Sequence, residues 1–382
     1  MRGHLAKKGN RYYAVIYEGV DPATGKDTHR WHPAGDTKKG AEKILADLVK
    51  RVHDGDYRAP DKITLGIYML ERWLPSKRTR VKASTAAAYE GNIRLHIDPY
   101  IGRIPLQKLQ PEDLDELYVK LLTEGKRNGA GGGLSAKSVR NVHATIQSAL
   151  TDAVRKGTVV RNVADLADPP AISRSGRTMR AWTSDELRVF LDAIRDHDLF
   201  ALYLLGATTG MRRGELAGLV WRNVDLDGAR LTVNQQIVSV EYELIEDDLK
   251  TAASRRTVDL DQHTVAELRK HRVRQLESQL ATGRRGDNGY VFAKADGSPI
   301  HPDFISQTFD RTVTKLDVPR VRLHDLRHTH ATILLQQNVP VKVVSERLGH
   351  SSPAFTMTVY QHVMPGMQAE AAATFGAAVF GS

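Results

Sequence analysis

The chain contains no cysteine among its 382 residues. This excludes a disulfide framework and a thiolate metal centre, and it fits a reducing compartment. No apolar run approaches the roughly 20 residues that span a bilayer, and the polar, basic N-terminus lacks the apolar stretch of a secretion signal. Aromatic residues are scarce at 6%, whereas the apolar content of 41% is typical of a globular protein. We therefore expect a cytoplasmic protein of two or three domains with no membrane partner.

Acidic residues do not balance the basic ones, and the imbalance is uneven along the chain. Residues 1–60 carry 12 Lys and Arg against 8 Asp and Glu, residues 61–175 carry 18 against 12, and residues 176–382 carry 25 against 25. The net charge of +10 thus lies entirely in the first 175 residues. Lys and Arg contacts to phosphates give a sequence-independent grip on DNA. The N-terminal half is therefore predicted to hold the DNA backbone.

Six polar residues of the second half stand in short, distinctive settings. They are Arg212 in TGMRRGEL, Lys250 in KTAASRRT, His324 and Arg327 in HDLRHTHA, His350 in RLGHSS and Tyr360 in TVYQHV. Together they supply concentrated positive charge, two imidazoles and a phenol. Arginine grips two phosphate oxygens at once, and cationic donors stabilise the charge that develops on those oxygens. The set is what an attack on a phosphodiester without a metal requires, and no cofactor is expected.

A role follows for each remaining member of the set. Tyr360 is the candidate nucleophile, because a covalent phosphotyrosine conserves the energy of the broken bond. Its phenol has an ordinary pKa of about 10 and needs a base, for which His324 is the candidate. Lys250 is the candidate acid for the departing 5′-oxygen, and His350 is placed on a non-bridging oxygen. Residue types and order along the chain resemble the tyrosine recombinase (phage integrase) family, in which these roles are assigned in the same way.

Neighbouring residues compete for two of these positions. Arg213 is an alternative to Arg212, but the family's arginine follows a Gly-Met or Gly-Leu pair, which favours Arg212. Glu215 lies one helical turn after Arg212 and is expected to orient its guanidinium. Arg255 and Arg256 compete with Lys250 on what reads as a hairpin tip followed by a strand.

A metal site is the rival interpretation of HDLRHTHA, since His324 and His328 are four residues apart. Against it, HExxH is absent, and no carboxylate cluster follows. No metal is therefore predicted, and His328 and His330 are expected to be structural residues of a helix.

Residues 1–60 predict a small basic sheet braced by one helix. RYYAVIYEG and KDTHRWHPA are typical of strands joined by the turn DPATGK, and GHLAKK could add a third. The helix that follows carries an apolar face, made of Ile44, Leu45, Leu48, Val49 and Val52. The segment resembles the arm-type DNA-binding domain of phage integrases, although a hairpin that only stabilises the fold is the alternative. The candidate DNA contacts there are Lys7, Lys8, Arg11 and Arg30.

Residues 61–165 are predicted to be helical and resemble the core-binding domain of the same family. One helix is expected to end near Asp98-Pro99, and another to be capped by Ser135. Residues near helix starts are the candidate phosphate contacts, with ordinary capping as the alternative: Ser84, Thr85, Lys137, Ser138 and Arg140. Residues 166–180 form the linker, and residues 181–382 the catalytic domain. Its tail places Met367, Ala371, Phe375 and Val379 on one helix face.

The resemblance covers essentially the whole chain and implies a fold class that is mainly α with small β-sheets. The three expected parts are an N-terminal small β-sheet with a helix, a helical core-binding (SAM-like) domain, and an α-rich catalytic domain with a small antiparallel sheet. It also implies an integrase that recombines attachment sites in double-stranded DNA through a 3′-phosphotyrosyl intermediate and a Holliday junction, as a homotetramer. A host DNA-bending protein and an excisionase (directionality factor) are implied partners, in the nucleoid of a bacterial host. A type IB topoisomerase and a non-catalytic DNA-binding regulator are the alternatives.

Overall fold

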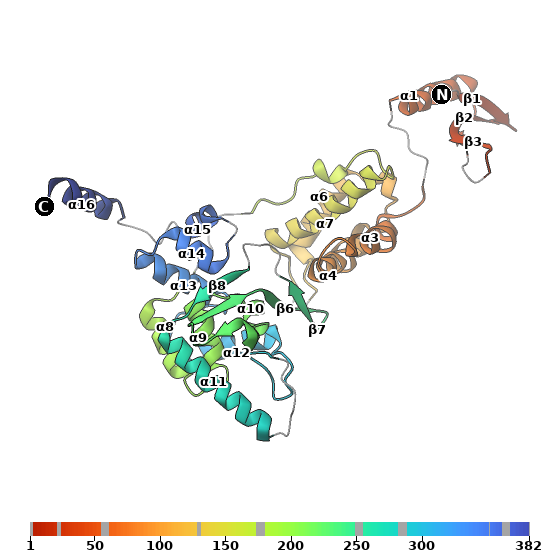
Figure 1. The fold of residues 1–382 in the computed structure, drawn as a ribbon. Coiled ribbons are helices and arrows are strands. Elements are labelled where there is room, and N and C mark those ends of the chain that lie inside the picture. Colours follow the sequence, from red (N-terminus) through yellow and green to blue (C-terminus); the bar gives the residue numbers. More distant parts are fainter. Residues whose placement is uncertain are drawn as a thin grey trace. The chain divides into compact units, whose positions relative to one another are not determined.

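The computed structural model describes residues 3–20, 24–54, 61–127, 131–172, 180–248, 255–281, 289–350, 352–360 and 367–381. The fold is mainly helical with small antiparallel sheets, as the sequence predicts (Figure 1). The chain divides into an N-terminal unit, Met1–Arg174, and a C-terminal unit, Ser175–Ser382. Within the described ranges, none of the helices has the length and apolarity needed to cross a membrane.

The N-terminal unit begins with a three-stranded antiparallel sheet in the order β1 (Gly3–Lys8), β2 (Arg11–Val20), β3 (Asp27–Pro33). Helix α1 (Lys38–His53) packs on one face and begins at Thr37, whose hydroxyl accepts from the Gly40 amide. Ala14 and Ala41 allow close approach of helix and sheet, and Leu45 packs against them. Ile44 was predicted on the buried face, but it is 39% exposed because it falls at the edge of the apolar stripe.

The rest of this unit is a helical bundle. Its elements are α2 (Leu65–Ile67), the π-helix η1 (Tyr68–Trp73), α3 (Leu74–Arg78), α4 (Ala83–Asn92), the π-helix η2 (Ile93–Ile97), α5 (Asp98–Ile101), η3 (Leu106–Lys108), α6 (Pro111–Glu124), α7 (Ala136–Arg155) and η4 (Val163–Asp165). The prediction that one helix ends near Asp98-Pro99 is wrong, since the chain stays helical to Ile101. Pro99 is accommodated because it lies in the first turn of a new segment, where its missing N–H is not needed.

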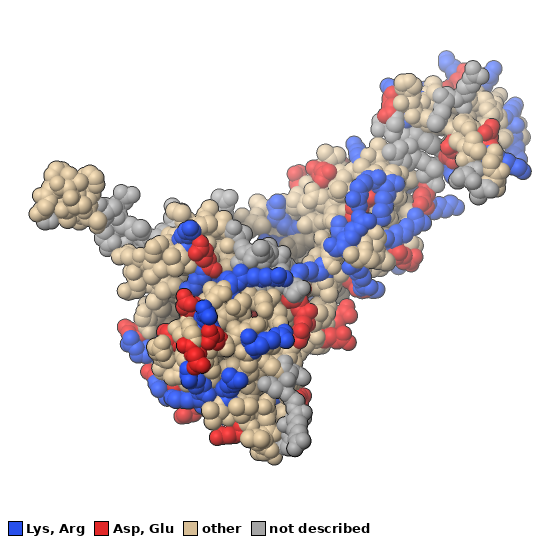
Figure 2. Space-filling model, viewed as in Figure 1, with Lys and Arg blue, Asp and Glu red and all other residues tan. Residues whose placement is uncertain are grey.

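The core of the bundle gathers around Trp73, whose indole N–H donates to Asp152 at 2.9 Å. Helix α7 begins as predicted at Ser135, whose hydroxyl accepts from the Ser138 amide at 3.1 Å. Figure 2 shows Lys and Arg gathering over this helical bundle, whereas both signs of charge are mixed over the C-terminal unit.

The C-terminal unit is built around α9 (Phe200–Thr209), which is buried on nearly all sides. Its other helices are α8 (Ser184–Ala193), α10 (Arg213–Ala217), η5 (Trp221–Asn223), α11 (Gln262–Ala281), α12 (Pro302–Val313), α13 (Asp325–Gln336), α14 (Val341–Leu348), α15 (Pro353–Tyr360) and α16 (Met367–Phe380). The strands are β4 (Val224–Asp225), β5 (Arg230–Val233), β6 (Gln235–Val240), β7 (Glu243–Asp248) and β8 (Arg256–Asp259). They form a three-stranded sheet ordered β4-β5-β8 and a separate hairpin β6-β7.

Helix contacts bring distant segments to one place. Helix α13 packs on α9, α14 packs on α13 and on β8, and α15 packs on α14. The ends of α9, α13 and α14 therefore meet, and these ends carry the polar motifs. On α16, Phe375 and Val379 are exposed, while the side chains of Met367 and Ala371 lie outside the described residues.

Candidate active site

A left-handed glycine sets the position of Arg212. Helix α9 ends at Gly210, with φ of 65°, and Arg212 is the residue that precedes α10. A side chain at Gly210 would clash, since an added Cβ would lie 2.5 Å from Leu348 and 3.0 Å from His330. The tight turn thus brings the first motif against α13 and α14.

Glu215 fixes the position of the Arg212 guanidinium. Its carboxylate accepts from the Arg212 backbone amide and from Nη1, both at 2.8 Å. The Glu215 side chain is 0% exposed, whereas that of Arg212 is 36% exposed. The contact predicted from the helical spacing is therefore present, and it leaves the guanidinium partly open to solvent.

Arg256 holds Glu215 from the other side. Its Nη1 and Nη2 donate to the same carboxylate at 3.2 and 2.9 Å, and its Nε donates to the Arg347 carbonyl at 2.7 Å. Burial raises the pKa of Glu215, but the hydrogen bonds and charges of Arg256 and Arg212 outweigh it and hold that pKa below its usual range. Arg256 was predicted as a competitor of Lys250, but it is buried against Glu215 and so cannot meet a leaving oxygen in this conformation.

Arg327 is the second guanidinium of the site. It lies on the first turns of α13, where Nη1 donates to the Gly210 carbonyl at 2.7 Å and Nη2 to the Leu348 carbonyl at 2.6 Å. Burial and the nearby charge of Arg212 lower the pKa of Arg327 to about 9, so it remains a cation at neutral pH. The Glu215 carboxylate thus fixes the guanidinium of Arg212, and the Gly210 and Leu348 carbonyls fix that of Arg327. The site therefore holds two positioned positive charges.

The predicted histidines line the same site as neutral rings. Burial, then Arg327, lowers the pKa of His324. Burial, then Arg327 and Arg212, lowers the pKa of His350 to about 4. The Nδ1 atom of His350 is 2.7 Å from the Thr356 hydroxyl on α15. Both rings can therefore accept or donate a hydrogen bond at neutral pH without adding charge.

Tyr360 ends α15 and is completely buried, with an exposed fraction of 0%. Its hydroxyl lies 2.8 Å from Nδ1 of His328. Burial raises the pKa of the phenol to about 12, although the charge of Arg327 acts in the opposite direction. The structure thus brings the phenol to the arginines and histidines, and in this conformation it is fully protonated.

His328 makes a contact that sequence reasoning did not predict. It was expected to be structural, yet it contacts the phenol oxygen, while its ring packs edge-on against His324 at 5.2 Å between centroids. The four-residue spacing that suggested a metal pair was the signal, because it puts both rings on one helix face. His330, in contrast, is structural as expected: its ring joins the Ala207 carbonyl and the Arg347 guanidinium inside the unit.

Two further candidates have other placements. Lys250 lies outside the described residues. Arg213 is turned away from the site and pairs with Asp303 at 2.8 Å and with the Ser306 hydroxyl at 3.0 Å. Among the residues that the structure describes, no group of three His, Cys, Asp or Glu side chains could hold a metal ion.

The chain is similar to known proteins in sequence and in fold. The C-terminal unit matches the model of the phage integrase family over residues 180–366, and residues 68–122 match the phage integrase N-terminal SAM-like domain. A tyrosine recombinase XerC-like protein of Caldanaerobacter subterraneus subsp. tengcongensis is 29% identical over 389 residues, covering 97% of each chain.

Two solved structures share the fold. The Tn1549 transposon integrase in complex with transposon right end DNA has a TM-score of 0.65 at 20% identity, covering 78% of this chain and 94% of that one. A lambda integrase tetramer bound to a Holliday junction has a TM-score of 0.54 at 18% identity, covering 93% and 94%.

The chain belongs to the tyrosine recombinase family. This recombinase is an enzyme that acts on DNA in site-specific recombination, and the comparisons do not favour a topoisomerase or a non-catalytic regulator.

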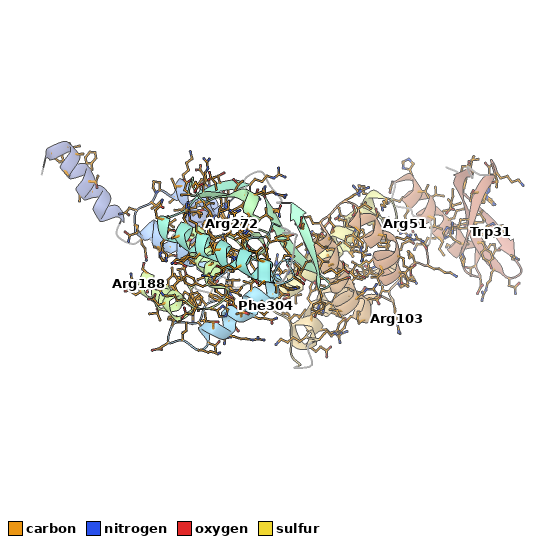
Figure 3. The ribbon with its side chains drawn as sticks, turned by 60° about the horizontal axis from the view of Figure 1, so that its bottom comes forward. Trp31, Arg51, Arg103, Arg188, Arg272 and Phe304 are labelled. Carbon is orange, nitrogen blue, oxygen red and sulfur yellow. The ribbon has the colours of Figure 1, made fainter. Side chains whose placement is uncertain are left out.

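The candidate DNA contacts of the recombinase differ in where they lie. Strand pairing puts Lys8 opposite Arg11 on the sheet face away from α1. The exposed Trp31, labelled in Figure 3, pairs with Val15 on the same face. Lys7 pairs with Tyr12, which packs with α1, so it belongs to the other face. Arg30 shares that other face and is paired with Glu18 at 2.6 Å. The four residues therefore do not form one surface.

In the helical bundle, Ser84 and Thr85 lie in the first turn of α4, and Lys137 in that of α7. The Ser138 hydroxyl is 3.0 Å from that of Ser135, within the cap of α7. Arg140 donates to the carbonyls of Pro169 and Pro170 at 3.4 and 3.1 Å, so it holds the first part of the predicted linker.

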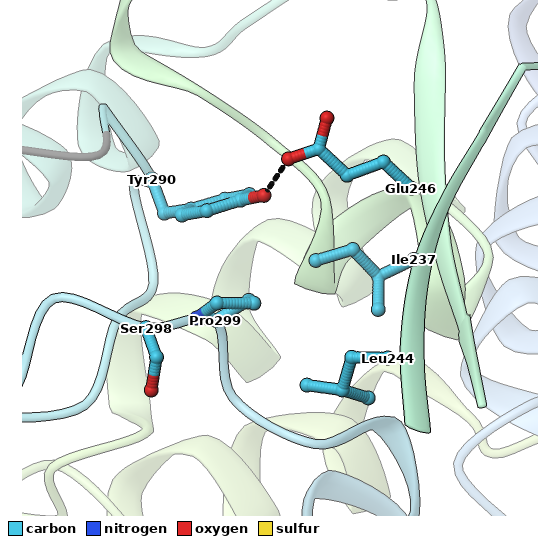
Figure 4. A pocket seen from close by; sticks show the side chains of 6 residues that line it. All are labelled: Ile237, Leu244, Glu246, Tyr290, Ser298 and Pro299. Carbon is cyan, nitrogen blue, oxygen red and sulfur yellow. Dashed lines mark hydrogen bonds between the residues drawn. The ribbon is translucent and has the colours of Figure 1, made fainter. Parts of the chain in front are cut away.

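A hollow of about 470 Å³ lies elsewhere in the C-terminal unit. It is lined by Ile237, Leu244, Glu246, Tyr290, Ser298 and Pro299, and the Tyr290 hydroxyl donates to Glu246 (Figure 4). A carboxylate at its wall repels phosphate, so this hollow does not compete with the arginine site for the DNA backbone.

Proposed function

We propose that this recombinase cuts one DNA strand with Tyr360 and rejoins it to another, so that a phage or other mobile element is integrated or excised. The observation that carries the proposal is the convergence of two rigidly held guanidinium groups, Arg212 and Arg327, on the site that holds the phenol. Each charge is fixed before DNA arrives, so little reorganisation is needed when a phosphate enters.

The strand transfer is written as an exchange of oxygen atoms on phosphorus. The Tyr360 oxygen loses its proton and forms a bond to phosphorus, while the bond from phosphorus to the 5′-oxygen breaks. The products are a 3′-phosphotyrosine and a 5′-hydroxyl, to which Lys250 would supply the proton. Attack by a 5′-hydroxyl from the partner duplex reverses the step, and no ATP is required because the bond energy is kept in the phosphotyrosine.

The remaining site residues receive roles in the same step. Arg212 and Arg327 neutralise the charge on the non-bridging oxygens, and His350 donates a hydrogen bond to one of them. Glu215 keeps Arg212 in place. Because Tyr360 is completely buried, its oxygen cannot touch a phosphate in this conformation. DNA binding must therefore shift α15 or the side chains around it. Before that shift, the free protein is inactive.

Assembly and targeting complete the proposal. Four copies would act on two attachment sites through a Holliday junction, and the tetramer described for lambda integrase on such a junction supports this arrangement. The exposed apolar side chains of α16 suit a contact with a neighbouring copy. A DNA-bending protein and a directionality factor of the host or element are further proposed partners. The substrate would place the enzyme at the nucleoid in the cytoplasm.

The DNA grip is proposed to come from the N-terminal unit. Lys8 and Arg11 share the open face of the sheet, and Lys137 lies at the start of a long helix, where amides and side chains meet phosphates. Ser84 and Thr85 would add contacts from α4. Lys7, Ser138, Arg30 and Arg140 are weaker candidates, because the first lies on the helix side of the sheet and the other three are engaged within the protein.

The test uses nicked duplexes tiled across the DNA on either side of the gene that encodes this chain. We expect an SDS-resistant, protease-sensitive adduct at a 3′ end, formed in the presence of EDTA. Tyr360→Phe should abolish the adduct, whereas Tyr242→Phe, a change at an exposed tyrosine, should not. An adduct that survives in Tyr360→Phe would refute the assignment of the nucleophile. If the protein binds the duplexes but forms an adduct on none of them, the result would count against cleavage by this protein.

A further inference from the structure

The phenol of Tyr360 has a partner that the family-based assignment does not use. The oxygen lies 2.8 Å from Nδ1 of His328, at the spacing of a direct hydrogen bond. His324, the residue predicted as the base, has its described ring contact with His328 and not with the phenol. His324 precedes the first turn of α13, and His328 lies one turn further along, on the side where α15 ends.

We propose that His328 is a catalytic residue of this enzyme, the base that takes the proton of Tyr360 when the phenol oxygen attacks phosphorus. The inference rests on the proposed function, since it names the proton acceptor of the same strand transfer. The proton moves from the phenol oxygen to Nδ1, the oxygen–phosphorus bond forms, and the imidazole becomes a cation. In the reverse step that proton returns to the phenol.

The proposed step specifies which ring nitrogen of His328 accepts the hydrogen bond and which carries the proton. For the phenol to give its proton to this ring it must be the donor, so the proposal assigns the acceptor role to Nδ1 of His328 and the ring's own proton to Nε2. A base must lie within hydrogen-bond reach of the proton it removes, and the distance in the free protein satisfies that requirement. The proposal requires this contact to be kept when α15 or the side chains around it shift to admit the phosphate.

The charges around the His328 ring explain why it does not take the phenol proton before DNA is bound. The charged and titratable groups that face it are Arg322, His324, Asp325, Arg327, His350 and Tyr360. Burial, then His324, lowers the pKa of His328 to about 4, while Asp325 raises it. In the free protein the weakly basic imidazole of His328 therefore contacts the weakly acidic phenol of Tyr360, and the proton stays on the phenol. A phosphodiester brings negative charge beside the two arginines, which favours a cationic imidazole and makes the transfer possible.

The decisive test compares two substitutions at His328 with one at His324. His328→Ala removes the base and leaves a space, whereas His328→Asn fills the space and keeps an acceptor near the Nδ1 position that cannot take up a proton. Both should slow formation of the phosphotyrosyl adduct by about 10²–10⁴-fold, the usual contribution of a general base. Added imidazole should restore His328→Ala and leave His328→Asn and His324→Ala unchanged. In His328→Asn the remaining rate should climb steadily with pH, because hydroxide must then remove the phenol proton.

A DNA-independent measurement tests the hydrogen bond by itself. In protein labelled with ¹⁵N-histidine, the resonance absent from His328→Asn should report a neutral ring protonated on Nε2, and its Nδ1 shift should change in Tyr360→Phe. Wild-type-like adduct rates in His328→Ala, or rescue of His324→Ala by imidazole, would overturn the proposal. A wild-type protein that forms no adduct on any tiled duplex is a different result, because it removes the proposed function and this inference with it.

Discussion

The buried carboxylate of Glu215 offers the sharpest test of how the site is held together. Its side chain is 0% exposed and accepts four hydrogen bonds, two from Arg212 and two from Arg256. Glu215→Gln keeps the size of the side chain but removes its charge and turns an amide N–H toward a guanidinium. Removing one partner of a buried ion pair costs about 3–5 kcal/mol. Since a domain is stable by about 5–15 kcal/mol, the C-terminal unit should still fold but be much weakened.

A double substitution separates stability from activity. In Glu215→Leu with Arg256→Met, both buried charges are gone, and apolar replacement of a buried pair is often neutral or stabilising. Most of the lost stability should therefore return. Activity should not return, because Arg212 still lacks the carboxylate that fixes it, and loss of one aligned donor costs about 10²–10³ in rate.

The free energy of opening is measured by native-state hydrogen exchange, read on peptides of α9 and β8 in the full chain. Adduct formation on the cleavable duplex is measured on the same samples. A cost below about 1 kcal/mol for Glu215→Gln would refute the argument from burial. Full activity in the double variant would refute the claim that Glu215 positions Arg212.

Four further outcomes follow from the structure. Burial lowers the pKa of His330 to about 3, so the unfolded chain takes up a proton below about pH 6.5 that the folded chain does not. His330 alone should contribute a loss of about 2 kcal/mol of stability between pH 7 and 5, in addition to the losses from His328 and His350, whose pKa values are also lowered. In urea unfolding, His330→Phe should reduce the fall between these pH values by about 2 kcal/mol and leave the rest. Gly210→Ala should lower both stability and the adduct rate, since the residue has φ of 65° and its carbonyl accepts from a catalytic arginine. Ser135→Ala should cost about 1 kcal/mol in the helical bundle, detected by hydrogen exchange, and leave the chemistry of a pre-bound complex unchanged. Tyr360 and Arg212 should act within one subunit, so mixing Tyr360→Phe with Arg212→Gln subunits should restore no cleavage, and restored cleavage would refute this.

Much of the fold was predictable because local patterns and local structure agree. The alternating aromatic and β-branched run around Tyr13 predicts the central strand of the first sheet, and the serine before a long amphipathic run predicts the start of α7. Where prediction failed, a local rule was applied at the wrong place. Pro99 was read as a helix end, although it begins a new segment, and Ile44 was placed inside a stripe whose edge it occupies.

The sequence by itself determined which residue types are available for phosphodiester chemistry and, through helical spacing, that Glu215 lies beneath Arg212 and that His324 and His328 share a face. Spacing along a chain does not determine which of two rings meets a residue from another helix. That His328 contacts Tyr360, that Arg256 closes over Glu215, and that Arg327 is anchored by the Gly210 and Leu348 carbonyls were decided by tertiary structure. The physical reason is that each of these contacts joins segments far apart in sequence, and their partners are set by how α9, α13, α14 and α15 pack.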